Sequence, residues 1–112
     1  MTKLLNIQTS KDVIFTSPWI IADGLRPHRI VIRDLGPAVR MVSNTKYTCD
    51  NNEYVVHDEI LTDYEGDSIG AMLTSFQSGY YTTDIDDAIE VFTDRAKRSI
   101  RRGTVAKEVT YV

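Results

Sequence analysis

The residue types that perform nucleophilic or metal chemistry are few in this chain and form no known motif. Its only cysteine is Cys49, and its only histidines are His28 and His57. Cys49 and His57 flank the segment DNNE, so a hairpin turn there would bring them together by architecture alone. A phosphate-cradling glycine loop, a nucleophile elbow and the ligand spacing of a zinc or EF-hand calcium site are missing. We therefore expect no enzyme, no catalytic residues, no bound metal and no cofactor. We also expect His57, which precedes two acids, on the solvent face of a strand.

A second group of residues that could bind a ligand is rich in arginine and lies near the end of the chain. The segment DRAKRSIRRG, residues 94–103, places five positive side chains within eight positions. A helix end favours cations, and Asp94 can pair with a base three or four positions later, so local structure explains part of this charge. Four of the five are arginines, whose planar guanidinium binds phosphates and carboxylates in bidentate fashion. Phosphate recognition, of nucleic acid or a nucleotide, is therefore one candidate function. Its candidate residues are Arg95, Arg98, Arg101, Arg102, Arg29 and Arg33.

Charge is strongly segregated along the chain, although the formal net charge is only −3. Residues 47–94 contain twelve acids and no Lys or Arg, whereas residues 1–46 carry a net +4 and residues 95–112 a net +5. Antiparallel pairing could place strands of opposite charge side by side and so cancel much of the electric field of these segments. If the acids instead share a face, that face would attract and steer a protein with a basic surface. The candidate residues for such a protein-binding surface are Asp58, Glu59, Asp63, Glu65 and Asp67.

This charge pattern makes a non-enzymatic protein-binding module the leading functional prediction. Such a module would act as an inhibitor or adaptor that presents its acidic surface to a basic site on a target protein. Phosphate recognition is the first alternative, and a structural accessory role is the second. The sequence does not identify the partner and leaves open whether the chain forms a homo-oligomer.

Length and composition predict a single soluble domain. With 112 residues, 42% of them hydrophobic and 26% charged, the chain can bury a core without a disulfide or metal. The single cysteine cannot form an internal disulfide. The opening segment MTKLLNIQTSKD turns polar before a signal-peptide core is complete, and no apolar run is long enough to span a membrane. We therefore expect a cytoplasmic protein.

The clearest predicted element is a helix over residues 84–102. One apolar stripe at helical spacing contains Ile85, Ala88, Ile89, Phe92, Ala96 and Ile100. Thr83 is the expected N-cap, with acids in the first turn and arginines in the last. Gly103 is expected to end the helix in a left-handed conformation.

Upstream of this helix the hydrophobic period shortens to two, which predicts strands at residues 28–33, 37–43 and 53–61. Shorter strand candidates are LLNIQ and DVIFT, and turns are expected at residues 34–37, 49–53 and 63–67. Residues 68–78 fit a strand or a helix, and their Thr and aromatic content favours a strand. An edge strand at residues 28–33 would offer another explanation for Arg29 and Arg33, as protective charges. The expected fold is α+β, a mostly antiparallel sheet of four to six strands with the C-terminal helix packed on one face.

The segment GYYTTDIDDAIEVFTDRAKR resembles a recurring ending of short accessory proteins of bacteriophages. In those proteins a strand with paired aromatic residues runs into a helix of similar pattern. The resemblance covers only the last third of the chain. It implies a strand followed by a helix and a viral interaction protein, and it assigns a role to no residue.

Overall fold

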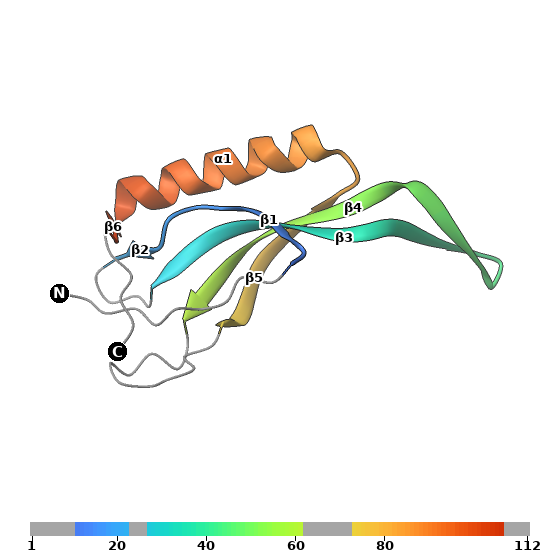
Figure 1. Ribbon diagram of the computed structural model, residues 1–112, viewed down its shortest axis with the longest axis horizontal. Helices are drawn as coiled ribbons and strands as arrows, with labels where there is room; N and C mark the ends of the chain where they lie inside the picture. The colour runs from blue at the N-terminus through green and yellow to red at the C-terminus, as the bar shows by residue number, and fades with distance from the viewer. Residues whose placement is uncertain (1–10, 23–26, 62–72, 107–112) are drawn as a thin grey trace.

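The fold is α+β, as the sequence predicted. The computed structural model describes residues 11–22, 27–61 and 73–106. Within these residues, six strands form one curled sheet, and a single helix lies across one face of it (Figure 1). The elements in chain order are β1 (Val13–Thr16), β2 (Ile20–Ile21), β3 (His28–Val42), β4 (Thr45–Leu61), β5 (Leu73–Thr82), α1 (Ile85–Arg102) and β6 (Thr104–Val105).

All strand pairs in the sheet are antiparallel, in the order β5-β4-β3-β2-β6, and β1 also pairs with β3. The long strand β3 therefore lies in the interior of the sheet rather than at its edge. The explanation of Arg29 and Arg33 as protective edge charges is wrong for this reason. The preference for strand within residues 68–78 is correct over residues 73–78, which belong to β5. The predicted elements LLNIQ and residues 63–67 lie outside the described residues.

The turn that joins β3 and β4 is not at either predicted position. Ser43 and Asn44 connect the two strands with φ angles of 49° and 64°, and positive φ at both central residues is typical of a two-residue hairpin turn that matches strand twist. The two expected turns, at residues 34–37 and 49–53, lie inside β3 and β4, where the register shifts on either side of Pro37. The Asp34 carboxylate accepts hydrogen bonds from the Gly36 amide at 2.9 Å and the Asn52 side chain at 3.1 Å. Turn-forming residues here build a bulge between two continuing strands.

The main core lies between α1 and one face of β3 and β4. Ile30, Ile32 and Val56 point from the strands towards Ala88 and Ala96 of the helix, and all five are buried. Small residues on the buried side of the helix let it approach the sheet closely. Around this centre pack four half-buried residues, Tyr54, Ile85, Val91 and Phe92.

The helix follows the predicted boundaries, but its caps and its stripe differ in detail. Asp84 rather than Thr83 is the N-cap, and its side chain accepts a hydrogen bond from the Asp86 amide at 2.9 Å. Ile89 and Ile100 lie at the margin of the stripe and are 37% and 41% exposed. Gly103 has φ −136°, which is extended and not left-handed, because the chain continues directly into β6.

Candidate functional site

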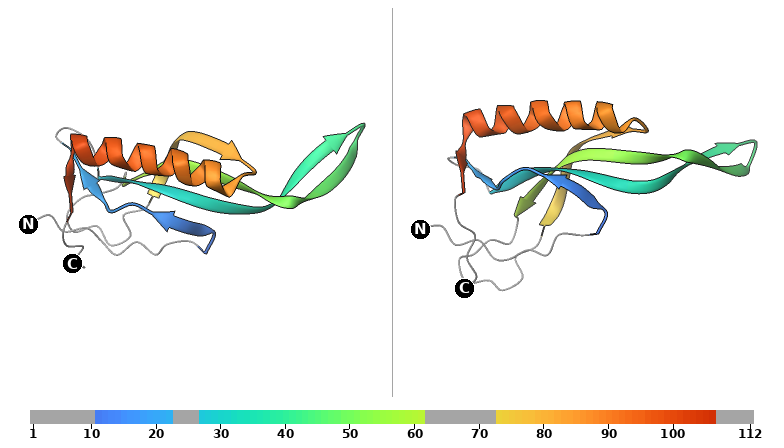
Figure 2. Two further views of the ribbon diagram at one scale, coloured as in Figure 1. Left: turned by 90° about the horizontal axis from the view of Figure 1, so that it is seen from above. Right: turned by 45° about the horizontal axis from the view of Figure 1, so that its top comes forward.

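The most prominent surface feature is a two-stranded ribbon that projects beyond the rest of the sheet (Figures 1 and 2). We call residues 35–42 of β3 and 45–53 of β4 the arm. Strand β1 pairs with β3 only as far as Arg33, and β5 pairs with β4 only from Tyr54 onward. Among the described residues, the arm therefore has no third strand on either side. It accounts for the long axis of a molecule that measures 54 × 29 × 20 Å.

Several large apolar side chains of the arm are exposed. Five of them are between 44 and 64% exposed: Leu35, Val39, Met41, Val42 and Tyr47. They occupy both faces of the ribbon, because Met41 is paired with Lys46 while the next pair, Arg40 with Tyr47, points the opposite way. A two-stranded ribbon with both faces in water is marginally stable. Large contiguous apolar patches on soluble proteins are often sites of interaction.

The tip of the arm and the start of α1 carry opposite charge. Residues 38–49 contain Arg40 and Lys46 and no acid. The first part of α1 is acidic, with Asp84, Asp86, Asp87 and Glu90. This acidic helix start lies beside the root of the arm, because Thr82, two residues before the helix cap, is paired with Tyr54.

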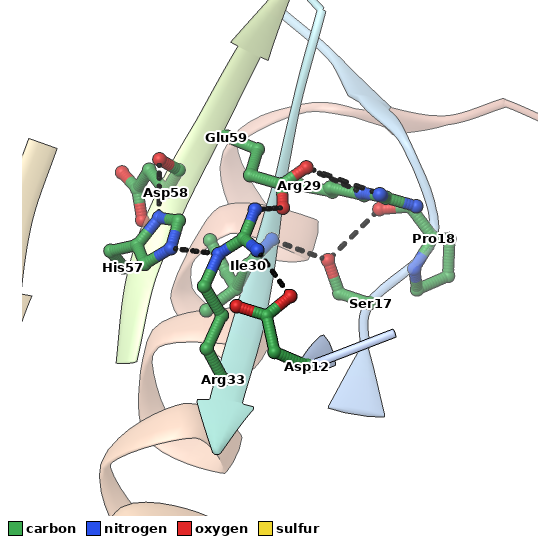
Figure 3. Close-up of polar contacts among 9 residues, drawn as sticks. All are labelled: Asp12, Ser17, Pro18, Arg29, Ile30, Arg33, His57, Asp58 and Glu59. Atoms are coloured by element: carbon green, nitrogen blue, oxygen red, sulfur yellow. Dashed lines mark hydrogen bonds and ion pairs between the residues drawn. The ribbon is translucent and has the colours of Figure 1, made fainter. Parts of the chain in front are cut away.

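A second candidate is a cluster of buried charges on β3 and β4 (Figure 3). Glu59 is completely buried, and its two carboxylate oxygens accept hydrogen bonds from Arg29 at 3.1 Å and Arg33 at 3.0 Å. Arg33 also pairs with Asp12 at 2.8 Å, and Arg29 lies 4.8 Å from the centre of the Trp19 ring. Two arginines thus face two carboxylates, and the formal charges balance. The cluster joins β3 and β4 to the segment that precedes β1.

His57 belongs to this cluster and is buried, so the prediction of a solvent-facing histidine is wrong. Its Nε2 accepts a hydrogen bond from the Arg33 Nε at 2.9 Å. An arginine can only donate, so the ring proton is on Nδ1, which lies 3.0 Å from the Asp58 carbonyl oxygen and donates to it. Cys49 and His57 are eight residues apart on one strand, roughly 27 Å at the usual rise, so the structure does not bring them together.

An open pocket of about 370 Å³ lies beside the cluster. Its lining residues are Asp12, Arg33, Leu35, Val55, His57, Gly79 and Tyr81. Three of its polar lining groups already bond one another, since Arg33 donates to Asp12 and to His57. The pocket therefore offers a mixed apolar and polar surface. In the described ranges, no group of three or more His, Cys, Asp or Glu side chains could hold a metal ion.

A third candidate is a groove between α1 and the sheet that brings together three of the predicted phosphate-binding residues. It has a volume of about 410 Å³ and is lined by Arg95, Arg98, Ser99, Arg102, Ile30 and Asp58. Arg98 pairs with Asp94 at 2.7 Å on the exposed side of the helix, and Arg95 donates to the Val56 carbonyl at 3.4 Å. Arg29 and Arg33 do not join this groove, because they are held by Glu59 on the other face of the strands.

The residues predicted to form an acidic protein-binding surface do not lie together on one described surface. Glu59 is not a surface residue, because it is enclosed by the two arginines with which it pairs. Asp58 lies in the arginine-lined groove. Asp63, Glu65 and Asp67 lie outside the described residues.

The arm was missed by the sequence analysis, although a signal for it exists. Ser43 and Asn44 separate two alternating segments by two residues, and such spacing is typical of a tight hairpin. The stronger turn composition of residues 34–37 and 49–53 obscured it.

Comparison with protein-family models, with curated proteins and with solved structures finds no match to this chain. The helix that the structure describes does not have the length and apolar character needed to cross a membrane.

Proposed function

We propose that this chain is a non-enzymatic protein-binding module and that the arm is its recognition element. The observation that carries this proposal is the exposure of five large apolar side chains on a ribbon that no other described strand supports. The acidic region predicted from the sequence contributes less to this proposal, since Glu59 is buried and Asp58 faces arginines.

The arm gains stability when a partner covers it. Each of the five side chains is already about half covered, so full burial would contribute roughly 1 kcal/mol apiece, or about 5 kcal/mol in total. Association itself costs roughly 4–15 kcal/mol in lost freedom. Apolar contacts alone therefore give weak binding, and polar or charged contacts of the arm must contribute to a stable complex.

The test replaces apolar arm residues without touching the body. The triple variant Val39→Thr, Met41→Thr and Tyr47→Thr should keep the circular dichroism spectrum of the wild type, because these side chains lie outside the core. In an extract of the cells that produce the protein, the wild type should elute as a complex heavier than 12.7 kDa, and the triple variant should elute at the monomer mass.

The matched control removes exposed apolar side chains elsewhere, with Ile14→Thr on β1 and Ile100→Thr on α1, both of which are 41% exposed. This variant should remain in the complex. A triple arm variant that elutes with the wild type would contradict the proposal.

A second candidate function is phosphate recognition, which the gathering of Arg95, Arg98 and Arg102 in one groove favours. Their spacing along the helix places the three guanidinium groups on one flank. Asp58 in the same groove opposes an anion. This function therefore requires that phosphate contacts outweigh one carboxylate.

Binding of labelled duplex DNA, single strands and nucleotides at low salt tests whether the groove recognises phosphate. Arg98→Glu with Arg102→Glu should abolish binding, whereas Asp58→Asn should strengthen it. Each phosphate contact contributes about −0.9 to the log–log salt slope on duplex DNA and about −0.7 on single strands. Arg101→Glu is the control, because Arg101 is exposed and does not line the groove. Absence of binding by the wild type, or equal loss in the control, would exclude this function.

A further inference from the structure

We infer that the arm docks on a second copy of this chain, with the basic tip of each arm on the acidic start of the other copy's α1. This inference rests on the proposed role of the arm as a recognition element and names its partner. Its basis is that one chain carries both complementary surfaces.

The donor surface is the distal arm. Arg40 and Lys46 lie on neighbouring pairs next to the turn, so their side chains project from opposite faces of the ribbon. Around them are Met41, Val42 and Tyr47, all more than half exposed. The tip therefore offers two cations and an apolar surface together.

The acceptor surface is the first two turns of α1. Asp84 caps the helix, and Asp87 accepts a hydrogen bond from the Tyr80 hydroxyl at 2.6 Å, which raises the pKa of Tyr80. Asp86 and Glu90 are exposed and lie one turn apart, and among the described residues their carboxylates accept no hydrogen bond and form no ion pair. Besides the hydrogen bond to Asp87, the Glu90 charge also helps to raise the pKa of Tyr80. The negative charge of these carboxylates complements the positive charge of the arm tip.

The geometry of the arm brings these surfaces together twice in one dimer. From its root to its turn the arm spans about nine residues, or roughly 30 Å. When two arms lie antiparallel about a two-fold axis, the tip of each reaches the root of the other. The start of α1 lies at that root, since Thr82 is paired with Tyr54. The same arrangement covers the exposed apolar side chains on one face of each arm, and a two-fold interface is the commonest route to a closed assembly.

The experiment exchanges the charges of the two surfaces. The acidic-arm variant carries Arg40→Glu and Lys46→Glu, and the basic-helix variant carries Asp86→Lys and Glu90→Lys. Light scattering should give the wild type twice the 12.7 kDa monomer mass. Each variant alone should associate at least about tenfold more weakly, because reversed charges then face like charges. An equimolar mixture of the two should recover the dimer, since every contact again joins opposite charges.

A control variant with Lys97→Glu and Arg101→Glu reverses two exposed charges on the other half of α1 and should dimerise like the wild type. Circular dichroism must show that all variants are folded. A wild type that stays monomeric at its highest soluble concentration overturns the inference, as does a mixture that fails to dimerise. The proposal that the arm is a recognition element is contradicted by a different result, namely a triple arm variant that keeps its complex in cell extract.

Discussion

Replacing Glu59 with alanine is expected to lower the free energy of unfolding by about 3–5 kcal/mol, because removal of one member of a buried ion pair leaves the others uncompensated. Both Glu59 oxygens are engaged, one by Arg29 and one by Arg33, and the side chain has no exposure to water. After the substitution, Arg29 would keep, among the described residues, only its contact with Trp19. A domain of this size has roughly 5–15 kcal/mol of stability in total, so the loss is a large fraction.

Urea unfolding followed by circular dichroism measures this effect, with Glu59→Gln as a milder variant that retains shape and one acceptor oxygen. Asp94→Ala is the matched control, because it breaks the exposed pair with Arg98, whose side chains are 57% and 66% exposed. Such surface pairs contribute about 0–1 kcal/mol. Equal losses from Glu59→Ala and Asp94→Ala would show that the buried cluster does not stabilise the fold as described.

Gly103→Ala should cost about 1–3 kcal/mol through overpacking. A Cβ atom at this position would lie 2.6 Å from the Ile20 Cγ2 and 3.0 Å from the Ile21 carbonyl oxygen. Ile20 is fully buried and cannot move aside. The φ of −136° is accessible to alanine, so the expected loss comes from the steric contact alone.

A double-mutant cycle isolates that contact. On an Ile20→Ala background, which removes the Cγ2 atom, Gly103→Ala should cost much less, and the coupling should amount to about 1 kcal/mol or more. Gly79→Ala is the control, because its Cβ would meet the flexible, exposed Tyr81 ring at 3.2 Å. Additive effects of the Ile20 and Gly103 substitutions would contradict the steric explanation.

The elements with local signals were predictable from the sequence. The period of the apolar residues and the acids and bases at its two ends located α1 within one residue of its observed start. The helical spacing of Arg95, Arg98 and Arg102 also explains why all three line the groove between α1 and the sheet. These features depend on residues within a few positions of one another.

The features that depend on distant residues were not predictable in this way. His57 and Glu59 read as solvent-facing because their neighbours are charged, but Arg29 and Arg33, about thirty and twenty-five positions earlier in the chain, satisfy them inside the protein. The count of acids in residues 47–94 could not reveal that one of them is enclosed. In the same way, the turn residues at 34–37 gave a strong local signal that the register of β3 against β4 overrode.

The central claim is that the arm contacts a protein, and site-specific photo-crosslinking tests it most directly. A photoreactive phenylalanine analogue replaces Tyr47 on the arm, or the exposed Arg101 in the last turn of α1 as a comparison. After irradiation of the cells that produce the protein, mass spectrometry identifies the adducts. We expect protein adducts at position 47, with a second copy of this chain as the partner, and few or none at position 101. Absence of adducts at position 47, or equal yields at both positions, would contradict this claim.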